Sequence, residues 1–178
     1  MILNEDYRDI LLALSTEQVD FILIGAYALA AHGYPRATMD IDLWVMPSPE
    51  NAAAVIRALK RFGSPLHGLE TEDLLRNDTI FQIGVAPRRI DLLTGATGLD
   101  FSSAAKNAVT RQIDGVDLKV LSIDDLIANR YAFLAKGKTV TFQRMETRDI
   151  FFQKFRIVAS WVREYVLSNY CKRGRLPD

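Results

Sequence analysis

Apolar residues follow the chain with two different spacings, and the two spacings predict different elements. A stripe of apolar residues three or four positions apart is typical of an amphipathic helix, whereas alternation or a short β-branched run is typical of a strand. Spacing and composition predict helices over 6–18, 26–32, 50–62 and 148–168, one or two helical turns over 70–76, and another helix that begins after Ser122. Strands are predicted over 19–24, 40–46, 79–85, 88–94, 108–113 and 116–121. The pattern therefore predicts an α/β protein.

Turn residues join two pairs of these strands. Asp114-Gly115 separates strands 108–113 and 116–121 and is typical of a tight hairpin turn. Ala86-Pro87 separates strands 79–85 and 88–94 and predicts a second hairpin. Both pairs are therefore expected to be antiparallel.

The strand predicted over 40–46 alternates between apolar and polar positions. One face carries Ile41, Leu43 and Val45, and the other carries Asp40, Asp42 and Trp44. Since side chains of a strand point alternately to its two faces, this pattern predicts one buried face. It also places the two carboxylates on the same face.

Two neighbouring carboxylates repel each other unless a cation lies between them. A hard divalent ion such as Mg²⁺ prefers oxygen ligands, so Asp40 and Asp42 are candidate metal ligands. Asp91 alternates with Ile90 and Leu92 on a second strand and could face the same site. The alternative is that Asp40 and Asp42 line the solvent face of an edge strand.

Composition excludes several other classes of site. The chain has 178 residues, 22 basic and 22 acidic side chains, two histidines and one cysteine, Cys171. A single cysteine rules out a disulfide framework and a cysteine-based zinc site. No apolar run is long enough to span a bilayer and no secretory signal is visible, so a soluble, cytoplasmic protein is expected.

The zero net charge conceals an asymmetry between two parts of the chain. Residues 1–129 hold 11 basic and 18 acidic side chains, and residues 130–178 hold 11 basic and 4 acidic ones. The first part therefore carries −7 and the second +7. This difference suits a site that gathers a cation in one part and a polyanion in another, although two solvated surfaces could also differ in this way.

A family resemblance rests on the residues around the paired carboxylates. The chain reads Gly25-Ala26-Tyr27-Ala28-Leu29, then His32-Gly33, then Arg36-Ala37-Thr38-Met39-Asp40-Ile41-Asp42-Leu43. It closely resembles the G-G-x-A-L…H-G…R-x-T-x-D-I-D-L signature of nucleotidyltransferases in the AbiEii/AbiGii toxin group, which belongs to the DNA polymerase β-like superfamily together with the small MNT proteins. Arg89-Ile90-Asp91-Leu92-Leu93-Thr94 is a further match. The resemblance runs from about Val19 to Asn129.

The resemblance implies a fold, a reaction and a set of site residues. The implied fold is a small mixed sheet flanked by helices, and the implied reaction moves a nucleoside monophosphate from an NTP to an acceptor hydroxyl with release of pyrophosphate. Mg²⁺, or Mn²⁺ in its place, would be held by Asp40, Asp42 and Asp91, with Asp91 also helping to activate the acceptor. The implied nucleotide-binding residues are Gly25, Ala26, Arg36, Thr38 and Arg130, the last in place of a lysine that relatives carry.

Organisation and partners are also expected from the resemblance. Residues 1–129 would form the nucleotidyltransferase core, and 130–178 a basic helical segment packed on it, frayed from about 170. The acceptor could be tRNA, a protein or a small molecule, and the resemblance also implies a toxin–antitoxin or phage-defence setting with a cognate partner protein. A homodimer through the aromatic helix 148–168 is a further expectation. Three alternatives stay open: a catalytically silent relative that acts as a binding partner or antitoxin, an antibiotic-modifying enzyme, and a plain metal-binding structural module.

Overall fold

The computed structural model describes residues 3–135 of the chain. The predicted helix 148–168, the dimer face assigned to it and the tail from about 170 lie outside these residues and stay predictions. Within the described part, no helix is both long enough and apolar enough to cross a lipid bilayer.

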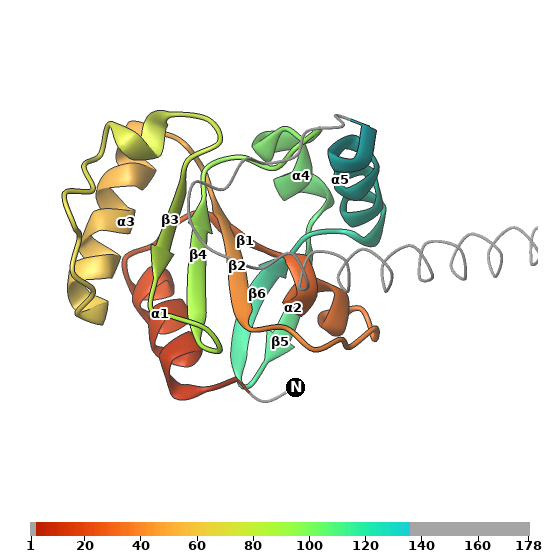
Figure 1. Cartoon of the computed structure of the whole chain (residues 1–178), viewed down its shortest axis with the longest axis horizontal. Helices are drawn as coiled ribbons and strands as arrows, with labels where there is room; N and C mark the ends of the chain where they lie inside the picture. Colours follow the sequence, from red (N-terminus) through yellow and green to blue (C-terminus); the bar gives the residue numbers. More distant parts are fainter. Residues whose placement is uncertain (1–2, 136–178) are drawn as a thin grey trace, which may run out of the picture. The chain divides into compact units, whose positions relative to one another are not determined.

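The centre of the fold is a mixed sheet of six strands in the order β3-β4-β2-β1-β6-β5 (Figure 1). The strands are β1 (Phe21–Ile24), β2 (Asp40–Val45), β3 (Ile80–Ile83), β4 (Arg89–Leu93), β5 (Val109–Ile113) and β6 (Val116–Val120). β2 runs parallel to β4 and β1 runs parallel to β6, whereas the β1–β2, β3–β4 and β5–β6 pairs are antiparallel. The expected mixed sheet is thus confirmed, and β2 lies in its interior.

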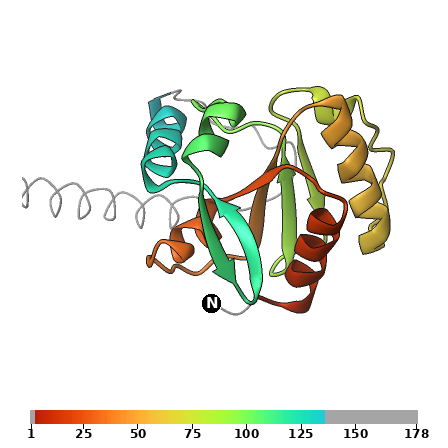
Figure 2. The ribbon, with the colours of Figure 1, turned by 180° about the vertical axis from the view of Figure 1, so that it is seen from behind.

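Helices cover both faces of this sheet. They are α1 (Glu5–Thr16), α2 (Gly25–Ala31), α3 (Pro49–Phe62), α4 (Phe101–Asn107) and α5 (Ile123–Ala135), with a short 3₁₀ helix η1 (Asp73–Leu75). Figures 1 and 2 show α1 and α3 together on one side of the sheet and α4 and α5 on the other. The larger core lies between the sheet and α1 and α3. A smaller core lies under α4 and includes Ile22, Ile24 and Trp44.

The helices begin where their sequences supply capping side chains. The side chain of Asn4 accepts a hydrogen bond from the Tyr7 amide at the start of α1, and Ser48 accepts one from the Asn51 amide at the start of α3. At α5 the Ser122 hydroxyl accepts from the Asp125 amide and donates to its carboxylate, so the predicted cap is confirmed.

Both predicted hairpins are present at the two edges of the sheet. β3 pairs with β4 around Ala86-Pro87, and β5 pairs with β6 around Asp114-Gly115. Asp114 and Gly115 have φ values of 51° and 81°. Positive φ at both central residues is what a two-residue type I′ turn requires, and Asp-Gly adopts it at little cost.

The prediction that β2 has one buried face was wrong. Trp44 is 2% exposed, and its ring meets that of Phe101 edge to face with centroids 5.1 Å apart. α4 therefore covers the part of this face that carries Trp44. The rest of the face carries the Asp40 and Asp42 carboxylates. The edge-strand alternative is also wrong, because β2 is paired on both sides, by β1 and by β4.

The boundary expected between residues 129 and 130 falls within α5, which runs continuously from Ile123 to Ala135. The part of the chain beyond this helix lies outside the described residues. The division into a core and a basic C-terminal segment therefore stays a prediction.

Candidate functional site

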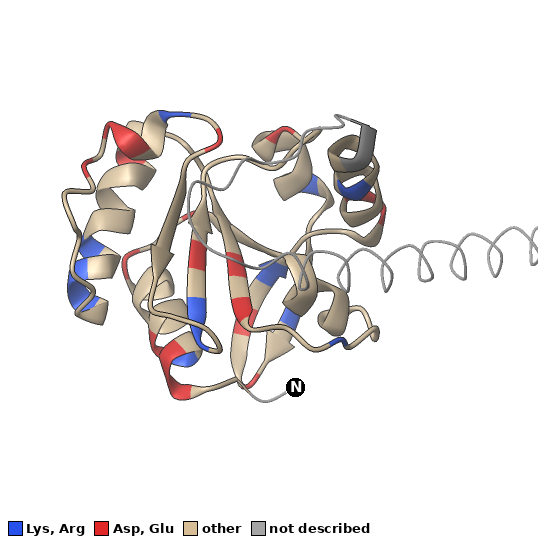
Figure 3. Ribbon diagram, in the orientation of Figure 1, with Lys and Arg blue, Asp and Glu red and all other residues tan. Residues whose placement is uncertain are grey.

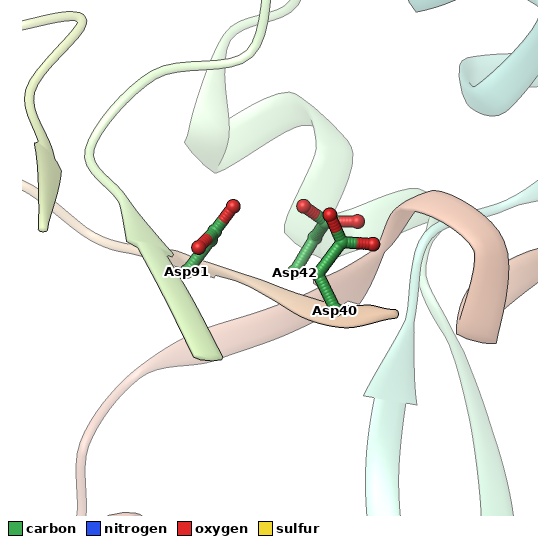
Figure 4. Close-up of side chains that lie close together, drawn as sticks. All are labelled: Asp40, Asp42 and Asp91. Atoms are coloured by element: carbon green, nitrogen blue, oxygen red, sulfur yellow. The ribbon is translucent and has the colours of Figure 1, made fainter. Parts of the chain in front are cut away.

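Three carboxylates converge on one face of the β2–β4 pair, as the strand alternation predicted. The parallel register places Asp42 beside Asp91 and Asp40 beside Arg89. Each aspartate offers one oxygen, and these oxygens all lie within 4.8 Å of one another. Figure 4 shows the three side chains extending from the same side of the two strands. A local sequence pattern and a long-range strand pairing thus build one acidic cluster.

The cluster lies largely out of solvent. Asp40 is 7% exposed and Asp91 6%, and Asp42 is half-buried. Buried carboxylates are costly unless hydrogen bonds or cations compensate their charge. Figure 3 shows the acidic segments of β2 and β4 side by side, with a basic segment of β4 next to them.

Arg89 supplies that compensation inside the cluster. Its Nε donates to Asp91 Oδ1 at 2.8 Å, and its Nη2 donates to Asp91 Oδ2 at 2.9 Å and to Asp40 Oδ2 at 2.6 Å. Burial by itself would lower the pKa of this guanidinium, but the hydrogen bonds to Asp91 and the charges of Asp91, Asp40 and Asp42 outweigh it and raise the pKa. Arg89 is therefore held in its charged form.

Two neutral side chains complete the polar contacts of the cluster. The Thr38 hydroxyl donates to Asp40 Oδ1 at 2.5 Å from the loop before β2. The Gln82 amide on β3 reaches the two oxygens of Asp91 at 3.4 and 3.5 Å. Thr38 thus orients Asp40, which is a different contact from the phosphate contact that the resemblance implies.

Gly25 is required by the close approach of Asp42. A Cβ on Gly25 would overlap the Asp42 carboxylate, and the residue has φ +66°, which side-chain-bearing residues rarely adopt. Ile24, the residue before it, is the β1 partner of Asp42. Gly25 and Ala26, predicted to approach phosphate, therefore begin α2 directly beside the cluster.

Burial and the charge of the cluster raise the pKa values of two tyrosines on the neighbouring helices α1 and α2. The Tyr7 hydroxyl donates to the carbonyl oxygens of Pro87 and Arg89, and its ring meets Tyr27 edge to face at 5.6 Å. Burial raises the pKa of Tyr7 to about 12, with further contributions from Tyr27, Asp40 and Asp91. Burial and the charge of Asp40 also raise the pKa of Tyr27.

Arg36 lies in the loop before β2 and Arg130 lies on α5, near enough for their charges to interact. Burial lowers the pKa of the Arg130 guanidinium, and the charge of Arg36 lowers it further. The Arg130 guanidinium also lies 5.6 Å from the centroid of the Phe133 ring. Their predicted role in nucleotide binding, and the expectation that Arg130 faces Asp40 and Asp42, stay predictions.

The residues present fit a divalent metal ion. The potential ligands are carboxylate oxygens, the donors that Mg²⁺ and Mn²⁺ prefer. The missing side chain at Gly25 leaves room for the Asp42 carboxylate at the start of α2. Asp42 and the Asp40 carboxylate next to it are therefore the residues best placed to hold such an ion.

Sequence reasoning missed three residues of this site. Arg89 had a usable signal, because it stands two positions before Asp91 on the same strand and must share its face. Gln82 could be found only through the register of β3 against β4, where it is the partner of Asp91. Tyr7 lies on the first helix and reaches the site only through tertiary packing.

Comparison with known proteins identifies the fold. No family model matches the chain, and no curated protein matches its sequence. One solved structure similar to this chain is a Thermotoga maritima protein that is provisionally described as a nucleotidyltransferase. It superposes with a TM-score of 0.52 at 18% identity, over 92% of this chain and 96% of that one. The antibiotic-resistance factor ANT(2'')-Ia superposes with a TM-score of 0.48 at 14% identity, over 96% of each chain. The chain thus has the α/β fold of the Thermotoga protein, with an acidic cluster on its sheet.

Proposed function

We propose that this protein is a metal-dependent nucleotidyltransferase that moves a nucleoside monophosphate from an NTP to an acceptor hydroxyl. The observation that carries the proposal is the convergence of Asp40, Asp42 and Asp91 on one face of β2 and β4. The fold shared with the Thermotoga protein supports it. The reaction forms a bond between the acceptor oxygen and the α-phosphorus and breaks the bond from that phosphorus to the leaving pyrophosphate.

Asp40 and Asp42 are the proposed holders of Mg²⁺, or of Mn²⁺ in its place. Thr38 and Arg89 fix the Asp40 carboxylate from two sides, and Gly25 allows Asp42 to stand at the start of α2. When bound, the ion would neutralise triphosphate charge and orient the phosphate chain. The Asp40 carboxylate is thus already positioned by its own hydrogen bonds.

Asp91 is the proposed proton acceptor for the attacking hydroxyl. Its two oxygens are oriented by Arg89, with Gln82 nearby, and it lies directly beside Asp42 in the strand register. A carboxylate held in one orientation can take the proton as the acceptor oxygen attacks.

The nucleotide's phosphates would lie toward the start of α2 and the loop before β2. Gly25 and Ala26 would present backbone amides there, and Arg36 and Arg130 would supply positive charge. Thr38 would act in the same loop through Asp40. The NTP is thus expected to bridge the acidic cluster and the two arginines.

A catalytically silent relative is the second candidate. The ion pairs of Arg89 with Asp40 and Asp91 favour it, because they satisfy two buried carboxylates without a metal. Such a protein would act as a binding partner or antitoxin. Antibiotic modification would use the same chemistry with a different acceptor, and a toxin–antitoxin or phage-defence setting would use a tRNA or protein acceptor.

The test is nucleotidyl transfer by the full chain. Each of the four NTPs, labelled at the α-phosphate, is incubated with Mg²⁺ alone, with total RNA, and with an aminoglycoside mixture, and label transfer and pyrophosphate are measured. We expect transfer by the wild type and by the control Asp117→Asn, an exposed aspartate on β6, and none by Asp42→Asn. Absence of pyrophosphate release in every arm, or full turnover by Asp42→Asn, would contradict the proposal.

A further inference from the structure

Arg89 and the three carboxylates lie at alternate positions on two paired strands, so they are neighbours on one face of the sheet. Arg89 and Asp91 are two residues apart on β4, so their side chains leave the same face. Their direct partners on β2 are Asp40 and Asp42. The four side chains therefore form a two-by-two arrangement, with one guanidinium among three carboxylates.

The guanidinium makes the contacts within this arrangement that a bound cation would otherwise make. It holds Asp91 through two parallel N–H bonds and reaches Asp40 through the same Nη2 atom. Paired N–H bonds from arginine to a carboxylate are strong and geometrically specific. Arg89 thus bridges a carboxylate of β4 and a carboxylate of β2, as a metal ion between them would.

The formal charge of the cluster also fits a single divalent ion. Three carboxylates carry −3 and one guanidinium carries +1, so the cluster has a formal charge of −2, which one divalent ion neutralises. Asp40 and Asp91 are almost fully buried. Removing the partner of a buried charge is strongly unfavourable, so a second ion that displaced Arg89 would have to replace all three of its hydrogen bonds.

We propose that Arg89 takes the place of a second divalent ion in this cluster, so that the chain binds one ion at Asp40 and Asp42 while Arg89 positions Asp91 as the proton acceptor. This inference rests on the proposed function. It makes Arg89 a positioning residue, and it assigns Asp91 to the acceptor hydroxyl and not to a second metal ion. A prediction about ion stoichiometry and affinity follows that does not depend on turnover.

The test is titration of the full chain with Mn²⁺ alone, by calorimetry and by the electron paramagnetic resonance signal of free Mn²⁺. We expect one Mn²⁺ per wild-type chain. Arg89→Gln should take up a second ion and bind the first on the order of tenfold more tightly, because a positive charge beside the ion is lost. The matched control is Arg88→Gln, whose exposed side chain lies 3.6 Å from Asp6, and it should behave as the wild type.

Each alternative outcome separates this inference from the proposed function. Two ions on the wild-type chain, or unchanged binding by Arg89→Gln, would overturn the role of Arg89 even if the chain transfers nucleotides. Binding of no Mn²⁺ at all would overturn both proposals. If Arg89→Gln does not fold, Arg89→Lys serves instead: it keeps the charge, so it should bind one ion, and two ions on that variant would overturn the inference.

Discussion

The carboxylate of Asp42 occupies the space that a side chain on Gly25 would need. The glycine has φ +66° and begins α2, and Asp42 belongs to the strand paired with β1. The two residues are 17 positions apart in the sequence. Any larger residue at position 25 would nevertheless clash with the Asp42 carboxylate. The start of α2 and the acidic cluster are therefore built as one unit.

Gly25→Ala should damage both stability and metal binding. The matched control is Gly33→Ala, because Gly33 also has a positive φ, +90°, but has open space around its Cβ position. We expect the control to lose about 1–2 kcal/mol from backbone strain alone and Gly25→Ala to lose more, because Asp42 must also move. Urea unfolding and Mn²⁺ titration measure the two effects. Equal losses in the two variants would show that the overlap with Asp42 has no consequence.

Mg²⁺ should stabilise the folded chain through Asp42. A ligand that binds only the native state adds about 2.7 kcal/mol at a hundredfold excess over its Kd, so the melting temperature of the wild type should rise with Mg²⁺. Asp42→Asn should lose this rise and should be slightly more stable than the wild type without metal, since like-charge repulsion is relieved. Thermal melts with Mg²⁺ and with EDTA check this, and Asp117→Asn should respond as the wild type. An Asp42→Asn chain that unfolds without metal would contradict the assignment.

Ionisation of the Tyr7 hydroxyl should make the protein less stable at high pH. Its pKa is raised to about 12 in the folded state from 10.0, so its contribution to stability is complete below pH 10 and is lost as the pH rises through 12. Tyr7→Phe should start lower, by about 1 kcal/mol for the lost hydroxyl hydrogen bonds, and should lose less stability between pH 10 and 12. Urea unfolding at several pH values measures this. Tyr131→Phe, which changes an exposed ring, should keep the wild-type profile.

Trp44→Ala should be severely destabilising. The side chain is 2% exposed and contacts Phe101, the first residue of α4, so its removal leaves a large cavity in the smaller core and should cost about 3–5 kcal/mol. Leu12→Ala, at a residue that is 45% exposed on α1, should change stability by much less. Chemical unfolding of both variants tests the finding that this face of β2 is buried. A loss below about 1 kcal/mol for Trp44→Ala would contradict it.

Arg130 should strengthen nucleotide binding in a salt-dependent manner. If Arg130 and Arg36 contact phosphate, NTP affinity falls as ionic strength rises, because salt screens these contacts. Arg130→Ala should bind NTP more weakly and with a smaller salt dependence. Binding of a non-hydrolysable NTP measured from low to high salt checks this, with Arg111→Ala, an exposed arginine on β5, as the control. Unchanged affinity and unchanged salt dependence would remove Arg130 from the nucleotide site.

Local patterns by themselves determined most of the elements and part of the site. Alternation predicted that Asp40 and Asp42 share a face, because the side-chain period of a strand is two. Asp114-Gly115 predicted a tight hairpin, because these residues readily adopt the positive φ values observed there. Ser122 and Asp125 predicted the start of α5 through a contact between near neighbours. Each of these features depends on residues within a few positions of one another.

Tertiary structure decided how these elements meet. The sequence could not show that β2 lies between β4 and β1, so it could not show that Trp44 is buried or that Asp42, and not Asp40, is the direct strand partner of Asp91. The placement of Arg89 between Asp91 and Asp40 depends on the same parallel pairing of strands about 50 residues apart in the chain. Strand order is set by which buried faces pack together across the whole core, and a local pattern carries no information about that choice. The carboxylates could therefore be identified from the sequence, whereas the cation that holds them could be identified only from the fold.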